Sequence, residues 1–189
     1  MMLKKIARTM AYIGSIITGF YLFTSAPGFH KREKWQHLTG WDYAHRGLHD
    51  NEHGIPENSM AAFQRAVDKG YGIELDVHLT ADNQLVVFHD DTLTRMCGIN
   101  KKISGFLYSY LQQLRLLGTG EGIPLFKDVL ALVDGKVPLI IELKVDGSNQ
   151  NLLCPLVWQL LSGYKGSYCI ESFHPFVLQW FKRHQPQVV

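Results

Sequence analysis

The sequence is poor in cysteine and in net charge. Its three cysteines, Cys97, Cys154 and Cys169, lie far apart and are odd in number, which fits neither a disulfide framework nor the close spacing of a cysteine metal site. The formal net charge is only +2, and no dense basic run occurs beyond residue 40, so nucleic-acid binding is not indicated. With 189 residues, 46% of them hydrophobic, the chain has the composition of one ordinary globular domain.

Charge is also missing from residues 9–29, which follow a basic tail at residues 1–8. A helix of this length can cross a hydrocarbon core of about 30 Å at about 1.5 Å per residue, although Gly, Ser and Thr make the segment only moderately hydrophobic. We expect a single-pass N-terminal membrane anchor, with its orientation open because basic residues flank both ends. A cleaved signal peptide is the alternative, but no good small-residue cleavage site is present.

A polar linker at residues 30–40 precedes a single predicted domain at residues 41–189, in which strand-like and helix-like segments alternate. Strands are predicted at residues 41–45, 71–79, 137–145 and 167–172. Helices are predicted at residues 59–70, 123–135, 149–163 and 173–184. The first helix has Ser59 as its N-cap and Gly70 as its C-terminal stop. This alternation indicates an α/β protein with a parallel sheet.

One connection departs from the alternation. Only five residues, "TADNQ", separate the second predicted strand from the apolar residues 85–88, whereas a parallel crossover needs a dozen or more. Residues 85–88 must therefore return antiparallel as a hairpin, which places His89 away from the next parallel strand. Residues 91–122 then form an irregular insertion with one helical patch at residues 107–118.

Two predicted strands carry charged residues among apolar ones. Glu74 and Asp76 are two residues apart and share one face of their strand, and Glu142 and Lys144 do the same on theirs. Polar groups near the carboxyl ends of parallel strands line ligand sites. Three converging carboxylates predict a hard divalent ion, Mg²⁺ or Ca²⁺. The alternative is a set of ion pairs, Glu142 with Lys144 and either of the other two carboxylates with Arg46.

Two histidines are candidates for proton transfer, because imidazole titrates near neutral pH. His45 ends the first predicted strand, and His89 follows the hairpin. The chain has nine histidines, so several without a catalytic role are expected. Among the others, His78 is the best candidate, since it lies on the same face of its strand as the two carboxylates.

The segments "AHRG", "PENS", "ELDVHLTADNQLVVFHDDTL" and "IELK" occur in this order between residues 43 and 173. In combination they resemble the glycerophosphodiester phosphodiesterase family. The resemblance implies a TIM-barrel (β/α)8 fold with a small insertion after the second strand, in agreement with the hairpin. It also implies metal-dependent hydrolysis of glycerophosphodiesters to glycerol 3-phosphate and an alcohol. Another metal-dependent barrel enzyme, such as a sugar isomerase, would not explain "HRG" together with "HD".

The resemblance implies three groups of site residues. The acid and the base are His45 and His89. The ligands of the divalent metal are Glu74, Asp76 and Glu142. The residues that contact or border the substrate are Arg46, Lys144, Glu57, Ser172 and Phe173.

The predicted domain is short for this fold. A TIM barrel has eight strands and typically about 250 residues, whereas residues 41–189 supply only the four predicted barrel strands. We therefore expect a partial barrel, truncated at its C-terminus, with an unpaired edge and an exposed apolar face. The alternative to an active hydrolase is consequently an inactive or unstable truncated remnant of one.

Overall fold

The computed structural model describes residues 9, 10, 12, 14–16, 18, 19 and 35–188. Among these residues, no helix is long and apolar enough to cross a membrane, and this finding overturns the membrane location predicted through residues 9–29. Small and polar residues dilute the apolar character of the described helical part, namely Thr9, Gly14, Ser15, Thr18 and Gly19. The remainder of that segment, the predicted tail at residues 1–8 and residues 30–34 of the linker lie outside the described residues.

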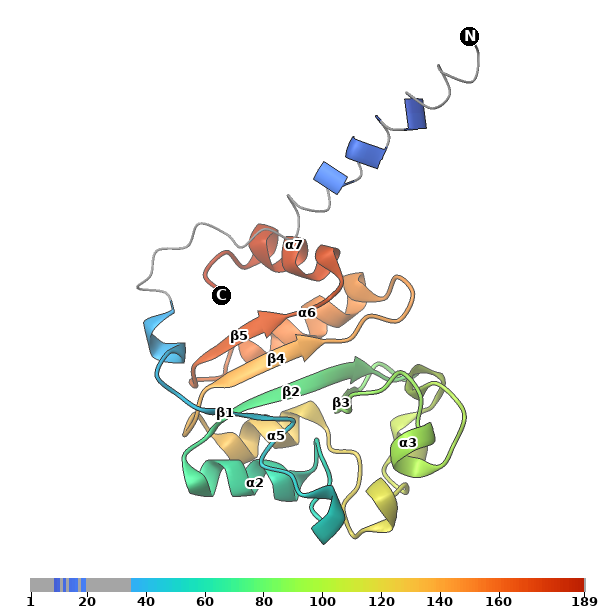
Figure 1. The fold of residues 1–189 in the computed structure, drawn as a ribbon, viewed down its shortest axis with the longest axis vertical. Helices are drawn as coiled ribbons and strands as arrows, with labels where there is room; N and C mark the ends of the chain where they lie inside the picture. Colours follow the sequence, from blue (N-terminus) through green and yellow to red (C-terminus); the bar gives the residue numbers. More distant parts are fainter. Residues whose placement is uncertain (1–8, 11, 13, 17, 20–34, 189) are drawn as a thin grey trace.

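Five strands form one sheet (Figure 1). They are β1 (Tyr43–His45), β2 (Gly72–Leu79), β3 (Leu85–Val87), β4 (Leu139–Leu143) and β5 (Tyr168–Glu171). The order β1-β2-β4-β5 is parallel throughout, while β3 pairs antiparallel with β2. The predicted hairpin is therefore confirmed. Its turn includes Asn83 with φ of 60°, a left-handed conformation that asparagine tolerates.

Four helices connect or follow the parallel strands. They are α2 (Met60–Lys69), α5 (Phe126–Val133), α6 (Gln150–Leu161) and α7 (Pro175–His184). The hydroxyl of Ser59 accepts a hydrogen bond from the Ala62 N–H, and Gly70 ends α2 with φ of 72°, as the sequence predicts. In Figure 1, α2 and α5 lie together on the β1–β2 side of the molecule, and α7 lies on the β5 side.

The main core lies between the helices and the apolar face of the sheet. Leu75 and Val77 on β2 and Ile141 on β4 are completely buried there. Because side chains alternate along a strand, the opposite face carries Glu74 and Asp76. Four parallel strands with helices on one face confirm the predicted partial barrel of the TIM type, with an insertion after its second strand.

The insertion between β3 and α5 has a small core of its own. It contains the short helices α3 (Thr94–Cys97) and α4 (Tyr108–Leu111) and the 3-10 turns η4 (Ile103–Gly105) and η5 (Leu116–Gly118). This core combines Val86 of β3 with the buried side chains of the insertion, which are Phe88, Leu93, Met96, Ile103, Leu111, Leu116 and Ile123. The helical patch predicted at residues 107–118 is thus only partly helical. Lys102 and Ser104 bond to the carboxylate of Asp146, which ties the insertion to the segment after β4.

Candidate active site

Three carboxylates meet on two neighbouring strands, in the middle of β2 and near the carboxyl end of β4. Glu74 and Asp76 extend from β2 and Glu142 from β4, where Asp76 and Glu142 are direct partners in the parallel register. One oxygen of each carboxylate lies within 4.8 Å of the others. The parallel register and the two-residue alternation along each strand produce this arrangement. The three oxygens are close enough to coordinate one cation.

Two basic side chains lie beside these carboxylates. Lys144 Nζ is 2.8 Å from Glu142 Oε2 and 3.0 Å from Asp76 Oδ1, and Arg46 Nε is 3.7 Å from Asp76 Oδ2. The predicted ion pairs are therefore formed. Arg46, however, makes a closer contact of 2.8 Å to another carboxylate, that of Glu57. Lys144 is thus the main counter-charge of the three, and about two negative charges are left over.

Burial and neighbouring negative charge both perturb Glu74. Burial and the neighbouring Asp76 carboxylate raise the pKa of Glu74 to about 7. On β4, Glu142 Oε1 is buried and has no hydrogen-bond partner among the residues that the structure describes. Three carboxylates with an unpartnered oxygen form a hard, all-oxygen donor set, which suits Mg²⁺ or Ca²⁺ rather than zinc. The residues present therefore fit a divalent cation.

Asn58 also belongs to the site, although it is not among the metal, substrate or proton-transfer residues predicted from the sequence. Its side-chain N–H donates to Asp76 Oδ2 at 2.9 Å, and its backbone N–H donates to the Arg46 carbonyl at 2.9 Å. Asn58 is 2% exposed and has φ of 53°, a conformation that asparagine adopts more readily than most residues. It therefore orients one predicted metal ligand and anchors the loop after β1. Its place in the "PENS" segment is the sequence feature that could have identified it as a site residue.

The backbone turns sharply where β1 ends. Arg46 has φ of 59°, unusual for a long side chain, and its N–H donates to Glu74 Oε2 at 3.0 Å. Gly47 follows with φ of 79°, and a Cβ built on it would lie 2.9 Å from Ala62 Cβ and 3.0 Å from Phe63 Cδ1. Glycine is required at this position for both its conformation and its lack of a side chain. Such local strain is typical of functional sites.

Substitution of Gly47 tests this requirement. We expect Gly47→Ala to lower the free energy of unfolding by about 2–4 kcal/mol, since it adds both backbone strain and a clash with α2. Gly54 is a matched control because it has the same φ of 79° and nothing within 4 Å of a built Cβ. Gly54→Ala should therefore cost only the strain, about 1 kcal/mol. Urea unfolding of both variants measures the difference, and equal losses would contradict the close approach.

Of the two predicted proton-transfer residues, His45 lies beside a carboxylate of the cluster and His89 lies beside Asp90. His45 Nε2 is 3.8 Å from Glu74 Oε2, and the His45 side chain is 69% exposed. Partial burial, and then the charge of Arg46, lower the pKa of His45, and His89 is close enough to contribute in the same direction. His89 Nδ1 is 2.7 Å from Asp90 Oδ1. The structure thus brings the two histidines to one site.

His78 has a supporting place in this site. It is 2% exposed, and its Nε2 lies 3.2 Å from the carbonyl oxygen of His89. Burial lowers the pKa of His78, which favours the neutral ring with a proton on Nε2 for this contact. His78 therefore holds the backbone of His89 and has no open path to a substrate.

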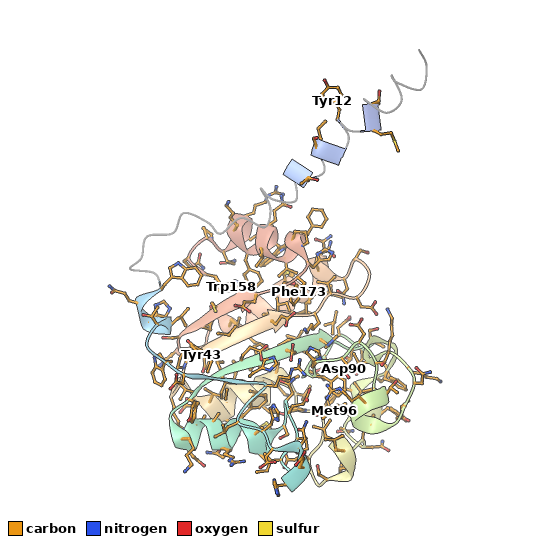
Figure 2. The ribbon with its side chains drawn as sticks, in the orientation of Figure 1. Tyr12, Tyr43, Asp90, Met96, Trp158 and Phe173 are labelled. Carbon is orange, nitrogen blue, oxygen red and sulfur yellow. The ribbon has the colours of Figure 1, made fainter. Side chains whose placement is uncertain are left out.

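Ser172 and Phe173, two of the residues predicted to border the substrate, differ in their surroundings. Ser172 Oγ donates to the Leu143 carbonyl at 2.7 Å and accepts from the His174 N–H, so its proton is used within the fold. Phe173 is 93% exposed, and Lys144 Nζ lies 5.9 Å from the centre of its ring. Figure 2 shows Phe173 and Asp90 near the carboxyl ends of β4 and β2. A cavity of about 260 Å³ opens there, lined by Glu142, Ile170, Glu171, Ser172, Phe173 and Leu178.

Glu57 is 6% exposed, and its carboxylate is enclosed by cationic partners. It accepts from Arg46 and from both terminal nitrogens of Arg95. Despite burial, these two guanidinium groups lower the pKa of Glu57 to about 2. Glu57 thus supports Arg46, and its predicted contact with the substrate remains a prediction. Arg95 and Asp90 are site residues that the sequence did not reveal, because nothing in its pattern pairs residue 57 with residue 95.

The acid stability of the protein should depend on Glu57. Because its folded-state pKa is lowered, its stabilising contribution is complete above pH 4.5 and is lost as the pH falls towards 2. Glu57→Gln should therefore lower the free energy of unfolding at pH 7 by about 3 kcal/mol and flatten its decline below pH 4.5. Urea unfolding between pH 2 and 7 measures both effects. The exposed Glu52→Gln is the control, and an equal pH profile for the two variants would contradict the prediction.

A family model matches most of the described domain. Residues 45–187 match the model of the family described as "Glycerophosphoryl diester phosphodiesterase family". The chain is 36% identical over 165 residues to rat (Rattus norvegicus) lysophospholipase D GDPD1, with 80% of this chain and 50% of that protein covered. It is 35% identical over 154 residues to the putative glycerophosphodiester phosphodiesterase YhdW of Bacillus subtilis, with 77% and 62% covered.

Solved structures resemble the fold as well. A phosphodiesterase of Oleispira antarctica in complex with the product sn-glycerol-3-phosphate superposes with a TM-score of 0.73 at 25% identity, covering 80% of this chain and 65% of that one. A glycerophosphodiester phosphodiesterase of Parabacteroides distasonis gives a TM-score of 0.67 at 33% identity, covering 78% and 62%. The chain spans about half the length of the GDPD1 relatives and less than two thirds of these solved structures.

Proposed function

The chain belongs to the glycerophosphoryl diester phosphodiesterase family, and we propose that it hydrolyses glycerophosphodiesters to glycerol 3-phosphate and an alcohol with a bound divalent cation, Mg²⁺ or Ca²⁺. The observation that carries this proposal is the convergence of Glu74, Asp76 and Glu142 beside two basic side chains. The similar Oleispira antarctica phosphodiesterase is described in complex with sn-glycerol-3-phosphate, which supports the substrate class.

Charge explains why these residues suit a phosphodiester. The substrate carries one negative charge, and more charge develops on the non-bridging oxygens as the bond to phosphorus breaks. Arg46 and Lys144, already held at the carboxylates, would bind these oxygens and stabilise the transition state. The three carboxylates would hold the cation, which supplies Lewis-acid stabilisation of the same charge when bound.

The histidines would move the two protons of the reaction. One of them removes a proton from the nucleophile, which is either water or the free glycerol hydroxyl of the substrate, and the other protonates the leaving alcohol. In His89, the contact of Nδ1 with Asp90 leaves Nε2 as the nitrogen available to the substrate. His45 has an exposed ring 3.8 Å from Glu74, so a ligand bound at the carboxylates can contact it.

A second candidate function is a remnant that binds the cation and a phosphate without turnover. The observation that favours it is the coverage of about half of the GDPD1 relatives, because the parts of those proteins that this chain does not match could contribute to substrate binding. On this proposal the carboxylate cluster binds metal, but no product forms.

An assay of the purified chain separates the two candidates. Glycerophosphocholine is supplied with Mg²⁺, with Ca²⁺ or with EDTA, and the release of glycerol 3-phosphate is measured while calorimetry follows cation binding. Metal-dependent release that stops in EDTA supports the hydrolase. Cation binding without release supports the remnant, and release that EDTA does not affect contradicts the metal site.

A further inference from the structure

Arg95, on α3 of the insertion, bonds to two carboxylates at once. Its Nε and Nη2 donate to Oδ2 and Oδ1 of Asp90, both at 2.9 Å. Its Nη1 and Nη2 donate to Oε2 and Oε1 of Glu57 at 2.9 and 2.7 Å. Both contacts are bidentate, which is the geometry that gives an arginine–carboxylate pair its directional specificity. The contact to Glu57 joins segments 38 residues apart.

Each of these carboxylates also touches a residue of the proposed reaction. Glu57 Oε1 accepts from Arg46 Nη1 at 2.8 Å, and Asp90 Oδ1 is 2.7 Å from His89 Nδ1. A continuous line of contacts therefore runs from Arg46 through Glu57, Arg95 and Asp90 to His89. Arg95 is its middle member and the point at which the insertion meets the loop after β1.

We propose that Arg95 is a positioning residue, which holds Asp90 and Glu57 as one unit so that His89 and Arg46 face the same phosphate in fixed orientations. The inference rests on the proposed function, because the roles of His89 and Arg46 belong to that function. Asp90 selects the ring form of His89 that has its proton on Nδ1. Asp90 can select this ring form only while its own carboxylate is fixed in orientation. Arg95 fixes it by bonding to both carboxylate oxygens.

The insertion does not depend on Arg95 for its fold. Its side chains form a separate apolar core, and Asp146 tethers it independently through Lys102 and Ser104. The Arg95 side chain is 44% exposed, but its partner Glu57 is buried, so Arg95→Gln should lower the free energy of unfolding by part of the loss expected for Glu57→Gln without disrupting either core. Loss of Arg95 should therefore release Asp90 and His89 while leaving the fold intact.

The first test observes His89 without substrate. We expect the wild-type protein, measured at a pH at which the His89 ring is uncharged, to show ¹⁵N resonances of a single His89 ring form, with the proton on Nδ1. Arg95→Gln should give a mixture of the two ring forms or broadened resonances. Arg115→Gln is the matched control, since Arg115 is an exposed arginine of the same insertion that donates to the carbonyls of Gln112 and Leu114.

The second test measures turnover. With glycerophosphocholine, Arg95→Gln should lower kcat by about 10–100-fold, the range seen when a supporting partner of an active-site group is lost, and change KM by less than about threefold. Arg95→Lys should recover little, because an ammonium cannot form two bidentate contacts. A cooperative unfolding transition with a midpoint above the assay temperature would show that the effect on kcat is not a loss of fold.

The outcomes are distinct. A His89 ring form unchanged by Arg95→Gln overturns the inference, as does an unchanged kcat in an active protein. If the protein has no activity, the proposed function fails but the NMR result still decides whether Arg95 orients His89. If Arg95→Gln does not fold, the claim that the insertion does not depend on Arg95 for its fold is wrong. Arg95→Lys is then measured in its place, and an unchanged His89 ring form in that variant overturns the inference.

Discussion

Substitution of Asp76 by asparagine is expected to lower glycerophosphodiester hydrolysis by about 10²–10³-fold, the loss that follows removal of one strong electrostatic contribution to the transition state. Asp76 is 0% exposed and lies at the centre of the site, in contact with Lys144, Arg46 and Asn58. Asparagine keeps the shape of the side chain but removes the charge that a divalent cation needs. Cation affinity measured by calorimetry should fall together with kcat.

A matched control separates this effect from a general effect of charge. Asp68 is an exposed aspartate on α2 that accepts from Gln64, so Asp68→Asn removes the same charge away from the site. It should leave turnover and cation affinity within about twofold of the wild type, as surface substitutions generally do. Normal cation binding in Asp76→Asn would contradict the assignment of the three carboxylates as metal ligands.

Loss of either predicted proton-transfer histidine should have an effect of similar size. We expect His89→Ala and His45→Ala each to lower kcat by about 10²–10⁴-fold, the usual contribution of a positioned acid or base. KM should change little, because the phosphate would be bound by Arg46 and Lys144. Steady-state kinetics with glycerophosphocholine measures both constants, and His53→Ala is the control, since His53 is an exposed histidine paired with Asp50.

The same variants assign the two roles. A substrate with a p-nitrophenol leaving group needs no protonation of that group, so it should restore the rate of the variant that lacks the acid and not of the variant that lacks the base. Equal recovery of both variants would show that neither histidine is the general base. If both variants kept kcat within about threefold of the wild type, proton transfer by this pair would be refuted.

The parallel sheet and its hairpin could be predicted because they depend on local patterns and chain lengths. Five residues after β2 cannot form a parallel crossover, so the hairpin with β3 follows from connection length alone. The two-residue alternation likewise places Glu74 and Asp76 on one face. The extent of helix in the insertion was harder to predict, because residues 107–118 are ordered by a small tertiary core as much as by their own periodicity.

The membrane location was predicted from the length of an uncharged segment. This criterion alone was too weak to support the prediction. Absence of charge is necessary for a membrane helix but does not establish sufficient hydrophobicity, since Gly, Ser and Thr residues also lack charge. In the part of the chain that the structure describes, no helix meets both conditions. The prediction for this segment therefore rested on one property, the lack of charge. The prediction for β2 and β4 rested on the alternation of apolar and charged residues along each strand.

The sequence by itself determined which strands carry the carboxylates, on which face, and that a hairpin and an insertion follow β2. These features depend on neighbours in the chain and on a period of two. Only the tertiary structure decided that Arg95 joins Glu57 to Asp90, that Asn58 bonds to Asp76, and that Glu57 and Ser172 have partners within the protein. The physical reason is that these contacts are between side chains brought together by folding, and no local pattern encodes which distant donor will meet which acceptor.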